Sequence, residues 1–135
     1  MKVFSIVFIF FFYVTLYGSD YVVVTYNTSL IQTLSKKQIK DIYMMKRHFI
    51  NCMKIIPVNL PTSLLIREKF EKNVLKVNRE KLSNYWIRQH FQGIRPPLIQ
   101  SSFVSVKLFL KNVDGAIGYL PKKSMSSDLK VLYEF

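Results

Sequence analysis

Residues 54–75 read KIIPVNLPTSLLIREKFEKNVL. Residues 54–59 are predicted to form a strand, in which Pro57 must lie at an edge or at a strand end because proline has no backbone N–H to donate. A short polar loop, residues 61–63, leads directly into a helix predicted over residues 64–75. A strand that leads straight into a helix is the building unit of α/β proteins, so this stretch sets the expected fold class.

The predicted helix has one apolar stripe and one charged side. The stripe consists of Leu65, Phe70 and Val74, with Ile66 flanking it. The side expected to face water consists of Arg67, Glu68, Lys69, Glu71 and Lys72. Within that side, Glu68 and Lys72 have the i, i+4 spacing that favours an ion pair along a helix.

Elements of the same two kinds are predicted on both sides of this unit. Further strands are expected over residues 21–26, 116–120 and 130–133, and further helices over residues 36–46, 79–91 and 103–112. The first strand has no polar alternation, which is typical of a strand buried on both faces. Residues 48–52 are expected to be a plain connector, and the side chains expected to point inward from the second of these helices are Leu82, Tyr85, Trp86 and Phe91. Strands separated by helices predict an α/β fold with a central, mostly parallel sheet flanked by helices.

The first 18 residues are typical of a signal peptide. Lys2 provides a positive start, residues 3–17 carry no charged side chain, and Gly18 is small. The apolar run is shorter than the roughly 20 residues that a membrane-spanning helix requires. We therefore predict a signal peptide, residues 1–18, followed by one α/β domain, residues 19–135, in the periplasm and without a transmembrane segment after cleavage. The alternative is an uncleaved signal that anchors the protein in a membrane.

The chain carries a large excess of positive charge. It has 20 Lys and Arg residues against 8 Asp and Glu residues, a formal net charge of +12. Such an excess attracts anions. Nucleic acid is the usual partner of a basic domain, but the predicted export argues against nucleic acid and favours a membrane surface, an acidic polysaccharide or a small anion. The other interpretation is that the charge only keeps the protein soluble.

Patterns typical of catalysis are lacking. The sequence has no Gly-x-Ser-x-Gly motif and no P-loop pattern. His48 and His90 have no cysteine or carboxylate at ligand spacing, so we expect no metal site, no cofactor and no enzymatic activity. The single cysteine, Cys52, is predicted to be a buried, inert thiol, with intermolecular pairing as the alternative.

The loop before the helix holds the best candidate binding site. Thr62 and Ser63 carry hydroxyls at the helix N-terminus, where the first backbone N–H groups lack helical acceptors and the helix dipole is positive. Arg67 lies one turn further on and is able to reach back as a forked donor. These three residues form the predicted anion-binding site. The competing interpretation is that Thr62 or Ser63 only caps the helix and that Arg67 is solvated.

Several segments, taken in order, resemble those of phosphate-type periplasmic substrate-binding proteins of ABC transporters. The segments are LSKKQIKDIY (34–43), IIPVN (55–59), SLLIREKF (63–70), YW (85–86), FQG (91–93), RPP (95–97) and GAIGY (115–119). Together they extend over almost all of residues 19–135. The chain looks like a short member of this family that consists of a single lobe.

The resemblance implies one lobe of a type II periplasmic-binding-protein-like fold, in which the ligand is held at helix N-termini between two lobes. It places Thr62, Ser63 and Arg67 where the second lobe of the family contacts phosphate. The Ser-Gly-Ser/Thr loop of the family is replaced here by residues 61–64, PTSL, without the glycine that allows close backbone approach.

The expected function follows from these points. We expect a non-enzymatic, exported binding protein of the transport type, with a weak site for phosphate or a similar small anion. A protein partner or a second copy of the chain is expected to close the cleft. The alternative is an envelope protein–protein interaction module that has lost solute binding.

Overall fold

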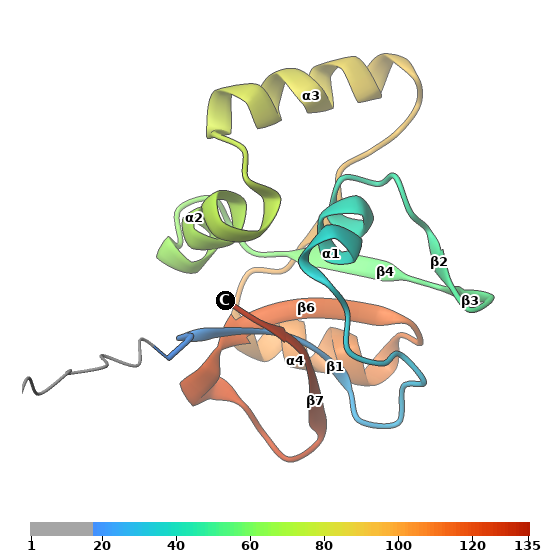
Figure 1. Cartoon of the computed structure of the whole chain (residues 1–135), viewed down its shortest axis with the longest axis vertical. Helices are drawn as coiled ribbons and strands as arrows, with labels where there is room; N and C mark the ends of the chain where they lie inside the picture. Colours follow the sequence, from blue (N-terminus) through green and yellow to red (C-terminus); the bar gives the residue numbers. More distant parts are fainter. Residues whose placement is uncertain (1–17) are drawn as a thin grey trace, which may run out of the picture.

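A five-stranded sheet forms the centre of the computed structural model, which describes residues 18–135 (Figure 1). In spatial order its strands are β5 (Leu98–Ile99), β4 (Ile56–Asn59), β6 (Ala116–Pro121), β1 (Tyr21–Tyr26) and β7 (Leu129–Glu134). Strand β4 is parallel to β5 and β6, whereas β1 is antiparallel to both β6 and β7. All strands except β1 therefore point the same way, which confirms the predicted mostly parallel α/β sheet.

Helices cover both faces of this sheet. They are α1 (Lys36–Tyr43), α2 (Leu65–Phe70) with its π-helical continuation η1 (Glu71–Leu75), α3 (Arg79–Phe91), α4 (Phe103–Asn112) and the short 3-10 helix η2 (Lys122–Ser124). Successive residues of a strand point to opposite faces. On β6, Gly118 faces Val106 of α4, whereas Tyr119 packs against Phe70 of α2. Helix α4 therefore lies on one face of the sheet and α2 on the other.

Three aromatic rings from three elements form the centre of the core. Tyr119 of β6 stacks on Phe70 of α2, with 4.1 Å between ring centroids and 8° between the ring planes. Tyr43 of α1 meets Phe70 edge-on at 4.6 Å. The middle of β1, residues 22–24, is fully buried. The prediction that this strand is covered on both faces is confirmed.

Pro57 lies within β4, an interior strand of the sheet. Its partner on β6 is Ile117, whereas β5 pairs only with Val58 and Asn59. Pro57 therefore has a neighbouring strand on one side alone. This position agrees with the expectation that a residue without an N–H lies at an edge or near a strand end.

The predicted connector at residues 48–52 is part of a two-stranded hairpin, β2 (Phe49–Ile50) and β3 (Met53–Lys54). Asn51 and Cys52 both have positive φ, 47° and 68°, as the two central residues of a type I′ hairpin turn require. The Cys52 side chain is exposed at this turn. The prediction of a buried thiol is therefore wrong, because the turn geometry places the residue regardless of its apolar character.

The helix after the loop is rotated relative to its predicted orientation. Leu65 is 59% exposed and Ile66 is buried, because Ile66 shares the i, i+4 stripe with Phe70. Arg67 and Glu71 lie beside this stripe and are only 8% and 4% exposed. The prediction that these two charged residues face water is therefore wrong.

Helix α3 stands away from the sheet (Figure 1). Leu82 is its one buried residue. Tyr85 and Trp86 are partly buried and pack edge to face at 4.9 Å. Phe91 is 85% exposed, so the prediction that it points inward is wrong. Because α3 stands away from the sheet, most of its side chains have no surface to pack against.

Residues 1–17 lie outside the part of the chain that the structure describes, so the predicted signal peptide stays a prediction. Within residues 18–135, no helix is long and apolar enough to cross a membrane. The 13 residues of α3 are fewer than the roughly 20 that a membrane span requires.

Gly115 is expected to tolerate no side chain. Its φ is +78°, and a Cβ there would overlap the backbone carbonyl of Lys54. Gly93 is the matched control, because its φ is +76° but a Cβ there would meet no atom within 4 Å. We expect Gly93→Ala to lower the free energy of unfolding in urea by about 1 kcal/mol, and Gly115→Ala to lower it by at least about 2 kcal/mol more. Equal losses in the two variants would contradict the close approach of the two chain segments.

Candidate functional site

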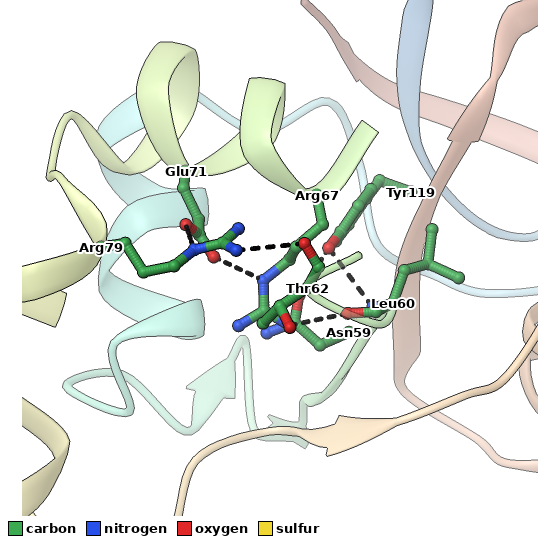
Figure 2. Close-up of polar contacts among 7 residues, drawn as sticks. All are labelled: Asn59, Leu60, Thr62, Arg67, Glu71, Arg79 and Tyr119. Carbon is green, nitrogen blue, oxygen red and sulfur yellow. Dashed lines mark hydrogen bonds and ion pairs between the residues drawn. The ribbon is translucent and has the colours of Figure 1, made fainter. Parts of the chain in front are cut away.

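The predicted site residues lie where β4 ends and the chain turns into α2. Strand β4 closes with Asn59, and residues 60–64 form the loop before α2 begins at Leu65. The carboxyl ends of parallel strands are the usual location of ligand sites in α/β sheets. Figure 2 shows the polar network around this loop, to which β6, α2 and α3 each contribute a side chain.

A buried ion pair lies at the centre of the network. Arg67 donates through Nε to Glu71 Oε1 at 2.8 Å, and Arg79 Nε approaches Glu71 Oε2 at 3.4 Å (Figure 2). Two positive groups share one carboxylate, so the cluster keeps one formal positive charge. Within residues 18–135 neither guanidinium pairs with a second carboxylate.

The same two arginines hold the loop in place. Arg67 Nη1 donates to the backbone carbonyl of Leu60 at 2.7 Å, and Arg79 Nη1 donates to that of Thr62 at 3.1 Å. Removing one partner of a buried ion pair typically costs about 3–5 kcal/mol, because the other charge is left uncompensated. Arg67 therefore supports the fold of this loop, whatever it also binds.

The Tyr119 hydroxyl fixes the orientation of the Asn59 amide. It accepts a hydrogen bond from the backbone N–H of Leu60 at 3.3 Å, so its own proton is donated to Asn59 Oδ1 at 2.5 Å. The amide nitrogen Nδ2 of Asn59 consequently lies on the side away from Tyr119. Burial raises the pKa of Tyr119 well above its usual value, with the Arg67 cation opposing this in part, so the hydroxyl remains a donor.

Thr62 and Ser63 are exposed, and neither caps α2. The N-cap position is Leu64, and no side chain accepts a hydrogen bond from the first turn. The Arg67 side chain extends to Glu71 and Leu60 and is not solvated. The interpretation of these residues as a plain cap with a solvated arginine is therefore wrong. The structure brings all three to one strand end, but it buries Arg67 in an ion pair.

Four residues to which the sequence analysis gave no ligand role complete the network, namely Asn59, Glu71, Arg79 and Tyr119. One signal for Glu71 is present in the sequence, because it lies four residues after Arg67 on the same helix. No such local signal exists for Tyr119, which lies 60 residues from Asn59. Only the pairing of β4 with β6 brings these two together.

Metal ligands do not gather in the described part of the chain. No three His, Cys, Asp or Glu side chains of residues 18–135 are placed to hold a metal ion. His90 lies near the end of α3, and His48 precedes β2. The groups that do gather at the end of β4 are N–H and O–H donors beside a positive charge, and these suit an anion.

The sequence matches no protein-family model and no curated protein sequence. The fold, in contrast, is shared with solved structures. An ABC-type phosphate transport receptor from Vibrio cholerae is similar with a TM-score of 0.69 at 18% identity. A putative phosphate ABC transporter substrate-binding protein with bound phosphate from Clostridium perfringens has a TM-score of 0.67 at 18% identity. PstS from Borrelia burgdorferi has a TM-score of 0.61 at 14% identity.

Each of these similarities covers 84% of this chain, but 45%, 44% and 46% of the respective neighbour. The chain thus spans less than half the length of the proteins that it matches. Its fold is that of one lobe of a PstS-like periplasmic binding protein, as the sequence segments predict. The class defined by this fold is that of binding-protein-like α/β domains.

Replacing Tyr119 with Phe is expected to lower the free energy of unfolding by about 2 kcal/mol, because two buried groups lose their partner. Tyr43→Phe is the matched control. Tyr43 is equally buried, but its hydroxyl only donates to strand carbonyls, with Val58 at 3.0 Å. We expect it to lose about 1 kcal/mol. Urea unfolding measures both values, and equal losses would contradict the two-sided role of the Tyr119 hydroxyl.

The contribution of the Tyr119 hydroxyl to the free energy of unfolding is expected to decrease at alkaline pH. Because the pKa of Tyr119 is raised in the folded protein, its contribution to stability is fully present below the unfolded-state pKa of about 10. That contribution is lost as the pH rises toward the folded-state pKa. Above roughly pH 10, the free energy of unfolding should therefore fall more steeply in the wild type than in Tyr119→Phe. Parallel pH profiles would show that Tyr119 titrates alike in both states.

Proposed function

We propose that this chain is an exported, non-enzymatic binding protein whose ligand is phosphate or a similar small anion. The observation that carries the proposal is the uncompensated positive charge of the Arg67, Glu71 and Arg79 cluster beside the loop that follows β4. Arg67 and Glu71 are buried, whereas the Arg79 side chain, which adds the second positive charge, is 51% exposed. The attraction of this charge for an anion is therefore expected to weaken as salt is added. The fold supports the same function, since one similar structure contains bound phosphate.

The proposed ligand groups are the hydroxyls of Thr62 and Ser63 together with the Arg67 guanidinium. Both hydroxyls are free of a capping role, which leaves them available to an anion at the loop. Residues 60–64 contain no glycine, so the backbone has little freedom to approach an oxyanion closely. We therefore propose a weak site with a dissociation constant of roughly 1 mM, equivalent to about −4 kcal/mol.

Transport in the periplasm is the physiological setting of this proposal. Residues 1–18 direct export, and the domain binds the anion at the end of β4. A protein partner or a second copy of the chain covers the open side of the site. No nucleic acid takes part.

A second candidate function is an interaction module of the cell envelope. Four exposed apolar side chains on α3 and β5 favour it, namely Ile87, Phe91, Leu98 and Ile99, each more than half exposed. Apolar and aromatic side chains of this kind form the centres of protein interfaces. This function predicts a stable complex with another protein and no effect of small anions on stability.

Thermal unfolding with added phosphate, sulfate or acetate at matched ionic strength tests the anion-binding function. A ligand that binds only the folded protein stabilises it by RT ln(1 + [L]/Kd), or about 1.4 kcal/mol at ten times Kd. Phosphate is expected to raise the Tm of the wild type. The double variant Thr62→Val and Ser63→Ala should fold normally, because both side chains are exposed, and should lose this response.

Ser127→Ala is the control, since it removes an exposed hydroxyl from another loop. Its Tm should respond to phosphate as the wild type does. Arg67→Ala is unsuitable, because the buried Arg67 supports the loop. An equal phosphate shift in the double variant would contradict the role of the two hydroxyls. No shift with any anion would refute the anion-binding function and favour the interaction module.

A further inference from the structure

A groove is lined by side chains of α3 and of the segment that joins α3 to β5. Its volume is ≈ 460 Å³, within the range of small-molecule sites. The apolar part of its lining consists of Trp86, Ile87, Phe91, Pro96, Pro97 and Ile99. A surface of this kind offers an apolar ligand both burial and aromatic contact.

Two buried polar side chains also line this groove, Asn59 and Arg67. They are 6% and 8% exposed, yet each keeps donor groups that no group within residues 18–135 accepts. Tyr119 engages only Oδ1 of Asn59, and Glu71 and Leu60 engage only Nε and Nη1 of Arg67. No described buried side-chain atom is both enclosed and without a partner. Asn59 Nδ2 and Arg67 Nη2 therefore reach the groove surface as free donors.

The charge around these donors is positive. The lining of the groove contains no Asp or Glu. Glu71, which pairs with Arg67, is also shared with Arg79, so the guanidinium is only partly neutralised. His90 is the other ionisable side chain of the lining. A ligand that matches this groove therefore has acceptor atoms with negative charge at one end and an apolar body at the other.

We propose that the groove binds a small carboxylate that carries an apolar body of aromatic size. One carboxylate oxygen accepts a hydrogen bond from Asn59 Nδ2 and the other accepts one from Arg67 Nη2, a charge-assisted hydrogen bond of the stronger kind. The body lies against Trp86 and Phe91. Phosphate suits this groove poorly, because the apolar walls provide no donors for its remaining oxygens and removing their water is costly. The site shares Arg67 with the proposed phosphate site, but it involves neither Thr62 nor Ser63 and is independent of that proposal.

Trp86 makes the proposal directly testable, because it lines the groove and is the only tryptophan of the chain. The experiment titrates the protein with phenylacetate while Trp86 fluorescence and Tm are recorded. Phenylacetamide has the same shape without the charge, and acetate has the charge without the body. A saturable response to phenylacetate is expected, at least about tenfold tighter than that to phenylacetamide, because hydrogen bonds to a charged group are the stronger ones.

Asn59→Asp is the decisive variant. It keeps an acceptor for Tyr119 but replaces the free donor with a second acceptor oxygen of negative charge, so phenylacetate affinity should fall at least about tenfold. Asn112→Asp is the matched control, because it makes the same change of charge at an exposed position on α4. Its affinity should equal that of the wild type. Ile87→Ala tests the apolar wall of the groove without altering a buried residue, because the Ile87 side chain is 55% exposed. This variant should bind phenylacetate more weakly than the wild type does, but its affinity for acetate should be unchanged.

Three results would overturn the proposal. They are no response of fluorescence or Tm to phenylacetate at roughly 10 mM, equal affinity for phenylacetamide, and equal affinity in both Asn59→Asp and Ile87→Ala. The phosphate titration separates this site from the proposed function. A phenylacetate response without a phosphate response supports the groove and refutes the phosphate site, whereas the opposite pattern refutes the groove alone.

Discussion

The ion pair between Arg67 and Glu71 is the interaction on which the rest of this strand end depends. Charges that are taken out of water must be paired and hydrogen-bonded, because an uncompensated buried charge costs several kcal/mol. The pairing is completed by the Leu60 carbonyl and by Arg79, so one carboxylate holds the loop, α2 and the start of α3 together. The positions of the candidate ligand-binding groups follow from this arrangement.

Tyr119 extends the network from the aromatic core to the end of β4. Its ring is part of the stack on Phe70, and its hydroxyl orients the Asn59 amide. Donors held in this way lose little freedom when a ligand binds, which favours affinity. At Arg67 and Tyr119, the two proposed binding sites therefore depend on groups that also stabilise the fold. Substitutions at exposed residues such as Ser63 and Ile87 are expected to change ligand affinity with little change in stability.

The similarity to phosphate-transport structures extends over less than half of their length, so it shows one lobe of a binding fold. A single lobe leaves a ligand open to water on one side, and most small-molecule sites bury most of their ligand. The two proposed sites differ in how they bind a ligand that a single lobe buries only in part. The loop at Thr62 and Ser63 accepts weak binding of a hydrated anion, whereas the groove beside α3 gains affinity from the apolar surface that its ligand buries.

The sequence by itself determined the α-helices and the strands β1, β4, β6 and β7, because the signals for these elements are local, and their alternation indicated the mostly parallel sheet. It did not indicate the short strands β2, β3 and β5. Ser35, Asn78 and Ser102 cap their helices, and such a cap is a local signal because it joins residues only two or three positions apart. Only the tertiary structure decided that Arg67 and Glu71 are buried, that Tyr119 orients the Asn59 amide and that Cys52 is exposed. The burial of a charged side chain depends on which distant segments cover it. The partner that orients Asn59 lies 60 residues away along the chain, beyond the reach of any local pattern.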